Sequence, residues 1–255
     1  MTSFKLSLRL KVVFVVLVVL IAVAASIWPA MLICRNHYQH GVKQALSDLN
    51  GRVSWGGRNF SFNFSRQTTF DDSALRRVLQ VTDGKIYSLN ISDTSVTDDG
   101  VHCLAGLHEL NSLDLSCTKI TDQGVACLQD LPQLECLNLA HTKVRGTTLN
   151  ELEKFSKLEL LNLAYSNVDD SGMTQIAKLR QLRILDLSGL SVSMAGLKQL
   201  ASVWRLQHIC LYDTSITEDQ SRELEQLFQA TIEVGVLRGK GGGITQKDGE
   251  KNHVK

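Results

Sequence analysis

The chain has 255 residues, of which 44% are hydrophobic and only 6% aromatic, and its formal net charge is +1. Because 27 basic residues nearly balance 26 acidic ones, the composition excludes a uniformly basic nucleic-acid-binding domain and an acidic disordered chain. Six cysteines are too few for a scaffold held together by disulfide bonds. The charge is uneven, since residues 1–11 and 238–255 each carry +3, which leaves −5 on residues 12–237. The chain therefore consists of chemically different parts.

A long run without a charge, from Val12 to Cys34, follows the basic segment 1–11. A helix of this length reaches roughly 35 Å, enough to cross a hydrocarbon core of about 30 Å. The run predicts one transmembrane helix over 12–34 that acts as an uncleaved signal anchor. Two alternatives remain open. The small residues around Ala24 could form the cleavage site of a signal peptide, and Cys34 could carry a lipid, although bulky residues precede it.

The basic residues around this segment predict its orientation. Lys5, Arg9 and Lys11 precede the apolar run, whereas only Arg35 and Lys43 follow it closely. Since basic residues are enriched on the cytoplasmic side, we expect the amino terminus in the cytoplasm and the remainder of the chain outside it.

One pattern returns with a constant period in the middle of the chain. It reads LxxLxLxx(T/S)x(I/V)xxxG(V/L)xxLxxL, and copies one to six begin at Ile86, Leu110, Leu134, Leu158, Leu182 and Leu206. Six consecutive copies over 86–229, without an insertion, predict a solenoid in which each copy stacks on its neighbours.

Each copy has two halves with different hydrophobic periods. In copy two, Leu113 and Leu115 alternate as in a strand with one buried side, whereas Val125 and Leu128 are spaced as in a helix. The predicted fold class is therefore α/β, a solenoid with short parallel strands on its concave face and short helices on its convex face.

Polar residues mark the turn between the two halves. Thr121 and Asp122 can accept the free amide hydrogens at the start of a helix, and Gly124 follows where we expect the helix to pack close to the strands. A column of hydroxyl residues at the turn that leaves each strand is expected to satisfy backbone groups. This column consists of Thr94, Thr118, Thr142, Ser166 and Thr214.

The TDxGVxxL phrase in this frame resembles the bacterial leucine-rich-repeat (LRR) proteins built on (I/V)TDxGLxxLxxLxxL. Many members of that group also carry an amino-terminal membrane helix. More distantly, the phrase is similar to the cysteine-containing repeats of F-box proteins. The resemblance covers residues 86–229 and implies a binding scaffold without a shared reaction.

The segments around the repeats complete the predicted organisation. We expect a juxtamembrane helix and strand over 35–59, an amino-terminal cap or degenerate repeat over 60–85, and a closing strand over 230–237. Residues 238–255 are rich in Gly and Lys and contain too little apolar surface to fold. Within the repeats, the pattern departs from its consensus at Arg145, Gly146 and Thr148 in copy three, at Leu190 in copy five, and at Gln220 and Ser221 in copy six.

The sequence shows no spacing that is typical of a catalytic, metal or cofactor site. His37 and His40 form an HxxH pair without the companion residues of a zinc site, and neither a GxSxG motif nor a Gly-rich loop that opens a helix is present. We therefore predict no enzymatic activity, no cofactor and no metal. Cys103 and Cys127 are expected to be free because adjacent helices lie about 8–10 Å apart. Free thiols are less usual outside the cytoplasm, which conflicts with the predicted location.

The residues that alternate with the buried leucines form the candidate binding face. The position between the two leucines of each LxL contributes Asp114, Asn138, Asn162 and Asp186, and the position two residues earlier contributes Leu160, Ile184 and His208. Tyr165 and Tyr212 follow the strands. Hydrogen bonding between neighbouring copies would also explain the Asn/Asp column. A surface that mixes aliphatic, aromatic and amide groups suits a protein or peptide partner.

The sequence thus predicts a single-pass membrane protein whose repeats form a non-catalytic protein-binding or scaffolding module. One alternative is a substrate-recognition adaptor of a ubiquitin ligase, but no F-box-like segment precedes the repeats. The other is a structural envelope protein that associates with copies of itself. Nucleic acid is not an expected partner.

Overall fold

The computed structural model describes residue 36 and residues 38–56, 59–128 and 130–235. The chain divides into two compact units, 1–50 and 51–255. The first unit contains a helix over 38–45 and the 3-10 helix η1 (Ser47–Leu49). No helix within the described ranges combines the length and apolar character that a membrane span requires. The predicted transmembrane helix 12–34 and the tail 238–255 both lie outside the described residues.

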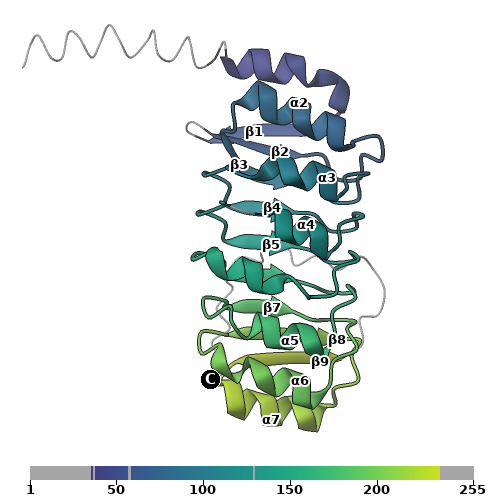
Figure 1. The fold of residues 1–255 in the computed structure, drawn as a ribbon, viewed down its shortest axis with the longest axis vertical. Coiled ribbons are helices and arrows are strands. Elements are labelled where there is room, and N and C mark those ends of the chain that lie inside the picture. Colours follow the sequence, from purple (N-terminus) through teal and green to yellow (C-terminus); the bar gives the residue numbers. More distant parts are fainter. Residues whose placement is uncertain (1–35, 37, 57–58, 129, 236–255) are drawn as a thin grey trace, which may run out of the picture. The chain divides into compact units, whose positions relative to one another are not determined.

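The second unit is built on one nine-stranded sheet whose strands follow chain order (Figure 1). β1 pairs with β2 in an antiparallel hairpin, and each of the other neighbouring pairs is parallel. The strands are β1 (Arg52–Gly56), β2 (Asn59–Asn63), β3 (Ile86–Asn90), β4 (Ser112–Asp114), β5 (Cys136–Asn138), β6 (Leu160–Asn162), β7 (Ile184–Asp186), β8 (His208–Tyr212) and β9 (Thr231–Gly235).

Short helices alternate with these strands and stack as a second layer on one side of the sheet (Figure 1). They are α2 (Asp72–Thr82), α3 (Asp98–Val101), η2 (His102–Leu104), α4 (Asp122–Cys127), η3 (Leu149–Lys154), α5 (Asp170–Ile176), α6 (Met194–Lys198), η4 (Gln199–Ser202) and α7 (Glu218–Phe228). The alternation of strand and helix confirms the predicted α/β solenoid.

The leucines of the repeat fill the space between the two layers. Strand pairing places Leu113 beside Leu137, and Leu161 beside Leu185, so equivalent leucines form continuous columns. Leu113 is 1% exposed and the other three are fully buried. Since each copy covers the apolar side of its neighbour, the core is continuous from one repeat to the next.

Aromatic rings fill the amino-terminal end of this core. Phe60, Phe62 and Phe64 alternate with polar residues in and just after β2, and Phe70 follows in the turn before α2. Consecutive ring centroids of these four residues lie 5.7, 5.7 and 4.4 Å apart. All four side chains are at most 2% exposed, so the cluster covers the first leucines as a preceding repeat would.

The Asp of the TD phrase joins each copy to the next. The carboxylate of Asp72 in α2 accepts hydrogen bonds from the amide (2.8 Å) and the hydroxyl (2.7 Å) of Thr97, the residue that caps α3. A Cβ atom built on Gly100 would lie 2.2 Å from Asp72 Oδ1. The nearest group to this glycine is thus the carboxylate of the preceding unit, and the side chain of Val96, in the turn after β3, lies 3.1 Å from the same Cβ position.

The same arrangement recurs along the solenoid. Asp98 binds the amide and hydroxyl of Thr121 at 2.9 and 2.6 Å, and Asp170 binds those of Ser193 at 2.8 and 2.6 Å. We call each such contact a carboxylate joint. Each one satisfies an amide at a helix start that has no partner within its own helix.

Copies three and five lack the Asp of this arrangement. Copy three has Gly146 in place of the Asp and forms only the 3-10 helix η3, whose cap residue Thr148 accepts no hydrogen bond from the helix amides and instead donates to the Asp122 carbonyl at 2.8 Å. In copy five, Met194 replaces the Asp that would have reached Thr217. Gln220 compensates, because its side chain accepts from the Thr217 amide (3.0 Å) while Thr217 Oγ1 accepts from the Gln220 amide (3.3 Å).

The hydroxyl column satisfies backbone carbonyls as predicted. Four threonines each donate to the carbonyl three residues earlier, at 2.7, 2.5, 2.7 and 2.7 Å for Thr94, Thr118, Thr142 and Thr214. Ser166 is the exception in this column, because its buried Oγ has no hydrogen-bond partner. Leu190 occupies the position in copy five and is 3% exposed.

Candidate interaction surface

An apolar row crosses the middle of the sheet. It consists of Cys136, Leu160 and Ile184, which are paired in register at the first positions of β5, β6 and β7. All three side chains are half-buried, and the exposed side chain of His208 continues the row on β8. The structure thus brings Leu160, Ile184 and His208 together, as the sequence indicated.

A row of longer polar side chains precedes the apolar row by one position. It contains Glu135, Glu159, Arg183 and Gln207. Arg183 Nη1 lies 3.2 Å from Glu159 Oε2, and its Nη2 donates to Gln207 Oε1 at 3.0 Å. The guanidinium is therefore held by its neighbours, while Glu135 contributes negative charge beside the apolar row.

The Asn/Asp column shapes the turns that leave the strands. Oδ1 of each member accepts from the amide two residues later, at 3.0, 2.9, 3.0, 2.9 and 3.0 Å for Asn90, Asp114, Asn138, Asn162 and Asp186. The expected hydrogen bond between neighbouring copies occurs from Asn90 to Asp114 (3.2 Å).

Burial divides this column into two parts. Asn162 and Asp186 are only 4% and 7% exposed, whereas Asp114 and Asn138 are half-buried. The polar atoms of Asn162 and Asp186 thus stabilise turns, while Asp114 and Asn138 remain within reach of a partner.

Tyr165 occupies a slot made by other copies. Its ring stacks on His141, with the centroids 4.7 Å apart and the planes within 7°. A Cβ atom on Gly189 would lie 2.3 Å from Tyr165 Cδ1, so the glycine leaves room for the ring. The hydroxyl donates to Asp213 in copy six, and this hydrogen bond raises the pKa of Tyr165 to about 12.

Sequence reasoning missed the contribution of His141 and Gly189 to this cluster. Both belong to a column with positive φ that recurs once per repeat, at Asp93, Cys117, His141, Tyr165, Gly189 and Asp213. Gly189 is the one member of this column without a side chain, and it follows Tyr165 by one repeat. A glycine directly after an aromatic residue in the same column is the sequence signal that could have indicated space for the Tyr165 ring.

The Tyr212 side chain joins the last two strands, β8 and β9, by a hydrogen bond. Its hydroxyl donates to Glu233 Oε2 in β9 at 2.8 Å, and this hydrogen bond raises the pKa of Tyr212 to about 12. Both tyrosines of the predicted face are thus hydrogen-bonded within the solenoid.

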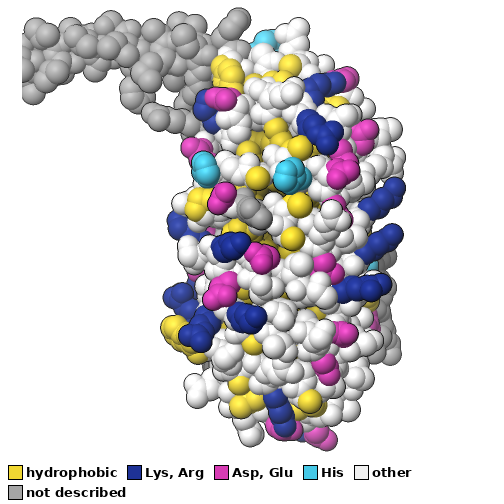
Figure 2. All heavy atoms as spheres, in the orientation of Figure 1, with side chains coloured by type: hydrophobic (Ala, Val, Ile, Leu, Met, Phe, Trp, Pro, Cys, Tyr) yellow, Lys and Arg dark blue, Asp and Glu magenta, His cyan; other side chains and the backbone are white. Residues whose placement is uncertain are grey.

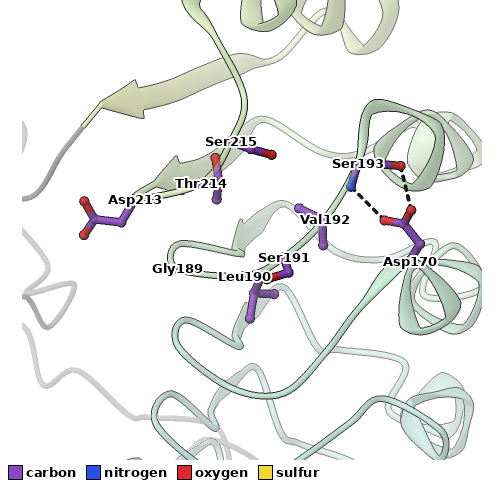
Figure 3. Close-up of a pocket in the computed structure, with 9 residues that line it drawn as sticks. All are labelled: Asp170, Gly189, Leu190, Ser191, Val192, Ser193, Asp213, Thr214 and Ser215. Carbon is purple, nitrogen blue, oxygen red and sulfur yellow. Dashed lines mark hydrogen bonds between the residues drawn. The ribbon is translucent and has the colours of Figure 1, made fainter.

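A shallow hollow lies between the turns that leave β7 and β8 (Figure 3). Its volume is about 380 Å³, and it is lined by residues 189–193, residues 213–215 and Asp170. Figure 3 shows the Asp170 carboxylate directed at Ser193, and the Asp213 carboxylate accepts from Tyr165. Both carboxylates that line the hollow are therefore hydrogen-bonded within the fold.

The cysteines that the structure describes are free thiols: Cys103, Cys117, Cys127, Cys136 and Cys210. Burial is the main cause that raises the pKa of Cys136. Burial also raises the pKa of Cys210, and together with the nearby carboxylates of Asp186 and Glu233 it brings this pKa to about 12. Since the thiolate is the reactive form, a raised pKa slows oxidation.

We expect the Cys210 thiol of the folded chain to react with a maleimide at pH 8 roughly 10²-fold more slowly than in the unfolded chain. Because the pKa of Cys210 is higher in the folded chain than in the unfolded chain, the protonated thiol contributes to the free energy of unfolding. This contribution is lost as the pH rises from about 9 to about 12. Mass spectrometry of labelled peptides between pH 7 and 9, with a urea-unfolded control, measures the rate. Equal rates in both states would contradict the expectation.

The residues that the structure describes contain no group of three or more His, Cys, Asp or Glu side chains arranged to hold a metal ion. His37 of the HxxH pair lies outside the described residues.

Comparison with known proteins identifies leucine-rich repeats in the chain. Residues 84–144 match the leucine rich repeat family model, which covers copies one and two and the start of copy three. No protein with a curated description matches the sequence.

Solved structures that match this chain include the following three. A leucine-rich-repeat protein of Leptospira interrogans is 19% identical, with a TM-score of 0.46 over 62% of this chain and 38% of that one. An internalin of Listeria monocytogenes is 22% identical, with a TM-score of 0.44 over 64% and 50% of the two chains, respectively. An internalin C2 of the same organism is 21% identical, with a TM-score of 0.48 over 76% and 91%. The chain thus spans half or less of the first two proteins.

Proposed function

We propose that this chain is a membrane-anchored, non-catalytic LRR protein that binds a protein or peptide through the concave face of its sheet. The observation that carries the proposal is the apolar row, because Leu160 and Ile184 lie side by side on paired strands and remain partly exposed. Aliphatic groups that folding leaves uncovered in the centre of a polar face are typical of binding sites.

Charge around the apolar row indicates the chemistry of the partner. Five carboxylate residues lie on or directly before strands β4 to β9, namely Asp114, Glu135, Glu159, Asp186 and Glu233. The basic side chain among them, Arg183, is already paired with Glu159. Electrostatic complementarity therefore favours a partner that surrounds an apolar centre with Lys or Arg side chains.

Site-specific photo-crosslinking tests this proposal. A benzophenone amino acid in place of Ile184 is expected to give one main adduct in cells, and the same probe in place of the exposed Gln123 on α4 serves as the control. In a second measurement, Leu160→Ala and Ile184→Ala are each expected to weaken binding of the captured partner roughly 10-fold. The same adduct from position 123 would contradict the proposed face, and an adduct with a second copy of the chain would instead favour self-association.

The membrane anchor rests on the uncharged run from Val12 to Cys34 and on the basic residues before it. We propose a single-pass protein with a cytoplasmic amino terminus and the repeats outside the cytoplasm. Protease added to intact cells or spheroplasts should then digest the repeats, while a cytoplasmic marker protein stays intact. Digestion only after lysis would place the repeats in the cytoplasm, where free cysteines are usual.

A further inference from the structure

Three consecutive loops that lead into β6, β7 and β8 form one continuous edge of the solenoid. These loops, residues 153–157, 177–181 and 201–205, are here called the entry-loop edge. Gln181 Nε2 donates to the Phe155 carbonyl and Ser202 Oγ donates to the Ala177 carbonyl, both at 2.9 Å. The three loops therefore lie against one another in chain order.

Positive charge is concentrated on this edge. The loops carry five basic residues and one acidic residue, whereas residues 12–237 as a whole carry −5. Lys154 pairs with Glu151 at 2.6 Å. The other four cations are exposed, and within the described part of the chain none of them has a carboxylate partner: Lys157, Lys178, Arg180 and Arg205.

Trp204 lies in the third of these loops, beside Arg205. Its side chain is 74% exposed, compared with 48% for Tyr87 and 46% for Leu227. The Arg205 guanidinium carbon lies 5.4 Å from the centroid of the Trp204 ring. Figure 2 shows basic side chains gathered beside an exposed hydrophobic group on the lower left-hand edge of the drawn face. Folding does not explain an indole so exposed, because it buries little apolar surface there.

We propose that the entry-loop edge docks on the surface of an anionic lipid bilayer. Tryptophan is favoured at the membrane interface, where its apolar ring and its N–H group both find suitable surroundings. Lys and Arg side chains near an anionic leaflet add attraction. The hollow described above lies at the opposite ends of the strands and is therefore separate from this edge.

The entry-loop edge shares no residue with the apolar row of the proposed binding face. The docking proposal also differs from the proposed anchor, because it depends on residues of copies three to five rather than on the segment 12–34. The two proposals can therefore fail independently.

Fluorescence of Trp204 in the full chain tests the docking. Trp28→Phe and Trp55→Phe leave Trp204 as the single tryptophan of the three. The chain is incorporated into, or added to, lipid nanodiscs of phosphatidylcholine with or without phosphatidylglycerol, both containing brominated acyl chains as quenchers. We expect quenching and a blue shift only in the discs with phosphatidylglycerol, and loss of both at high salt.

Charge variants in the same background define the surface. Lys178→Gln with Arg180→Gln is expected to lower the equilibrium constant for lipid contact roughly 30-fold, and circular dichroism verifies that this variant is folded. Lys119→Gln with Lys143→Gln, which removes two exposed cations from the turns that leave the strands, is the matched control and should change nothing.

Several results would overturn the proposal. These are an unchanged Trp204 spectrum in every disc, equal quenching in neutral and anionic discs, and equal loss in the control variant. A spectral shift with soluble polyglutamate but not with anionic discs would assign the edge to an acidic protein instead.

Discussion

Replacing Phe64 with alanine is expected to lower the free energy of unfolding by about 3–5 kcal/mol. The ring is fully buried and lies between Phe62 and Phe70, at centroid distances of 5.7 and 4.4 Å. Its removal leaves a cavity in the cluster that closes the amino-terminal end of the leucine core. Because a solenoid transmits stability only between neighbours, this end should open first.

Urea denaturation of the full chain, followed by circular dichroism, measures the loss, and hydrogen exchange locates it. Amides of β2 and α2 should lose more protection than those of β7. Tyr87→Ala is the matched control, since the Tyr87 side chain is 48% exposed, and its effect should stay within about 0.5 kcal/mol. A loss below about 1 kcal/mol for Phe64→Ala, well short of that range, would mean that the aromatic cluster does not support the core.

The second large effect is expected at a carboxylate joint. Asp72→Ala removes two hydrogen bonds to Thr97, and we expect it to cost about 2–3 kcal/mol. Gly100→Ala places a methyl group 2.2 Å from Asp72 Oδ1, and we expect it to cost about 2 kcal/mol. Alanine normally favours a helix over glycine by about 1 kcal/mol, so this substitution reverses the usual sign.

The double variant separates the proposed contact from a general sensitivity of α3. Without the Asp72 carboxylate the added methyl group has no close contact with it. The loss of unfolding free energy in the double variant should therefore be smaller than the sum of the two single losses by about 1 kcal/mol or more. Gly41→Ala is the control, because this helical glycine has no atom within 4 Å of the added methyl group, and it should be neutral or stabilising. Strictly additive costs would contradict a direct contact between Asp72 and Gly100.

The sequence alone was sufficient for the features that repeat. Leu113 and its equivalents recur once in every copy, and a period of this kind determines which residues face the core. The hydroxyl column follows for the same reason, since Thr94 and Thr118 occupy one position of the period and make the same hydrogen bond.

Contacts between copies were not visible in a single copy of the pattern. Asp122 was expected to accept amide hydrogens at the start of its own helix, yet its carboxylate accepts from the amides of Arg145 and Gly146, 23 and 24 residues later. Tyr165 was expected to face a partner, but its hydroxyl reaches a residue 48 positions away. Asn162 and Asp186 share a column with Asp114 but are more deeply buried, and the pattern gives no measure of depth.

Trp204 was missed for a different reason. Trp204 lies outside the consensus positions, so the repeat pattern neither requires nor excludes a tryptophan there. Only the exposed fraction of its side chain shows that the residue is not part of the core. Departures from a repeat thus become informative once the burial of each position is known.

The carboxylate joints also divide the solenoid into mechanical segments. Gly146 and Met194 lack the side chain that would tie copy three to copy four and copy five to copy six. Copies four and five remain tied to each other through Asp170 and Ser193. The boundary between copies five and six is still bridged by Tyr165 with Asp213 and by the ion pair of Lys198 with Glu223 (2.6 Å), so separation under tension should begin between copies three and four. Leu160 and Ile184 belong to the tied pair, so they would move as one rigid body while the rest of the solenoid bends around a bound partner.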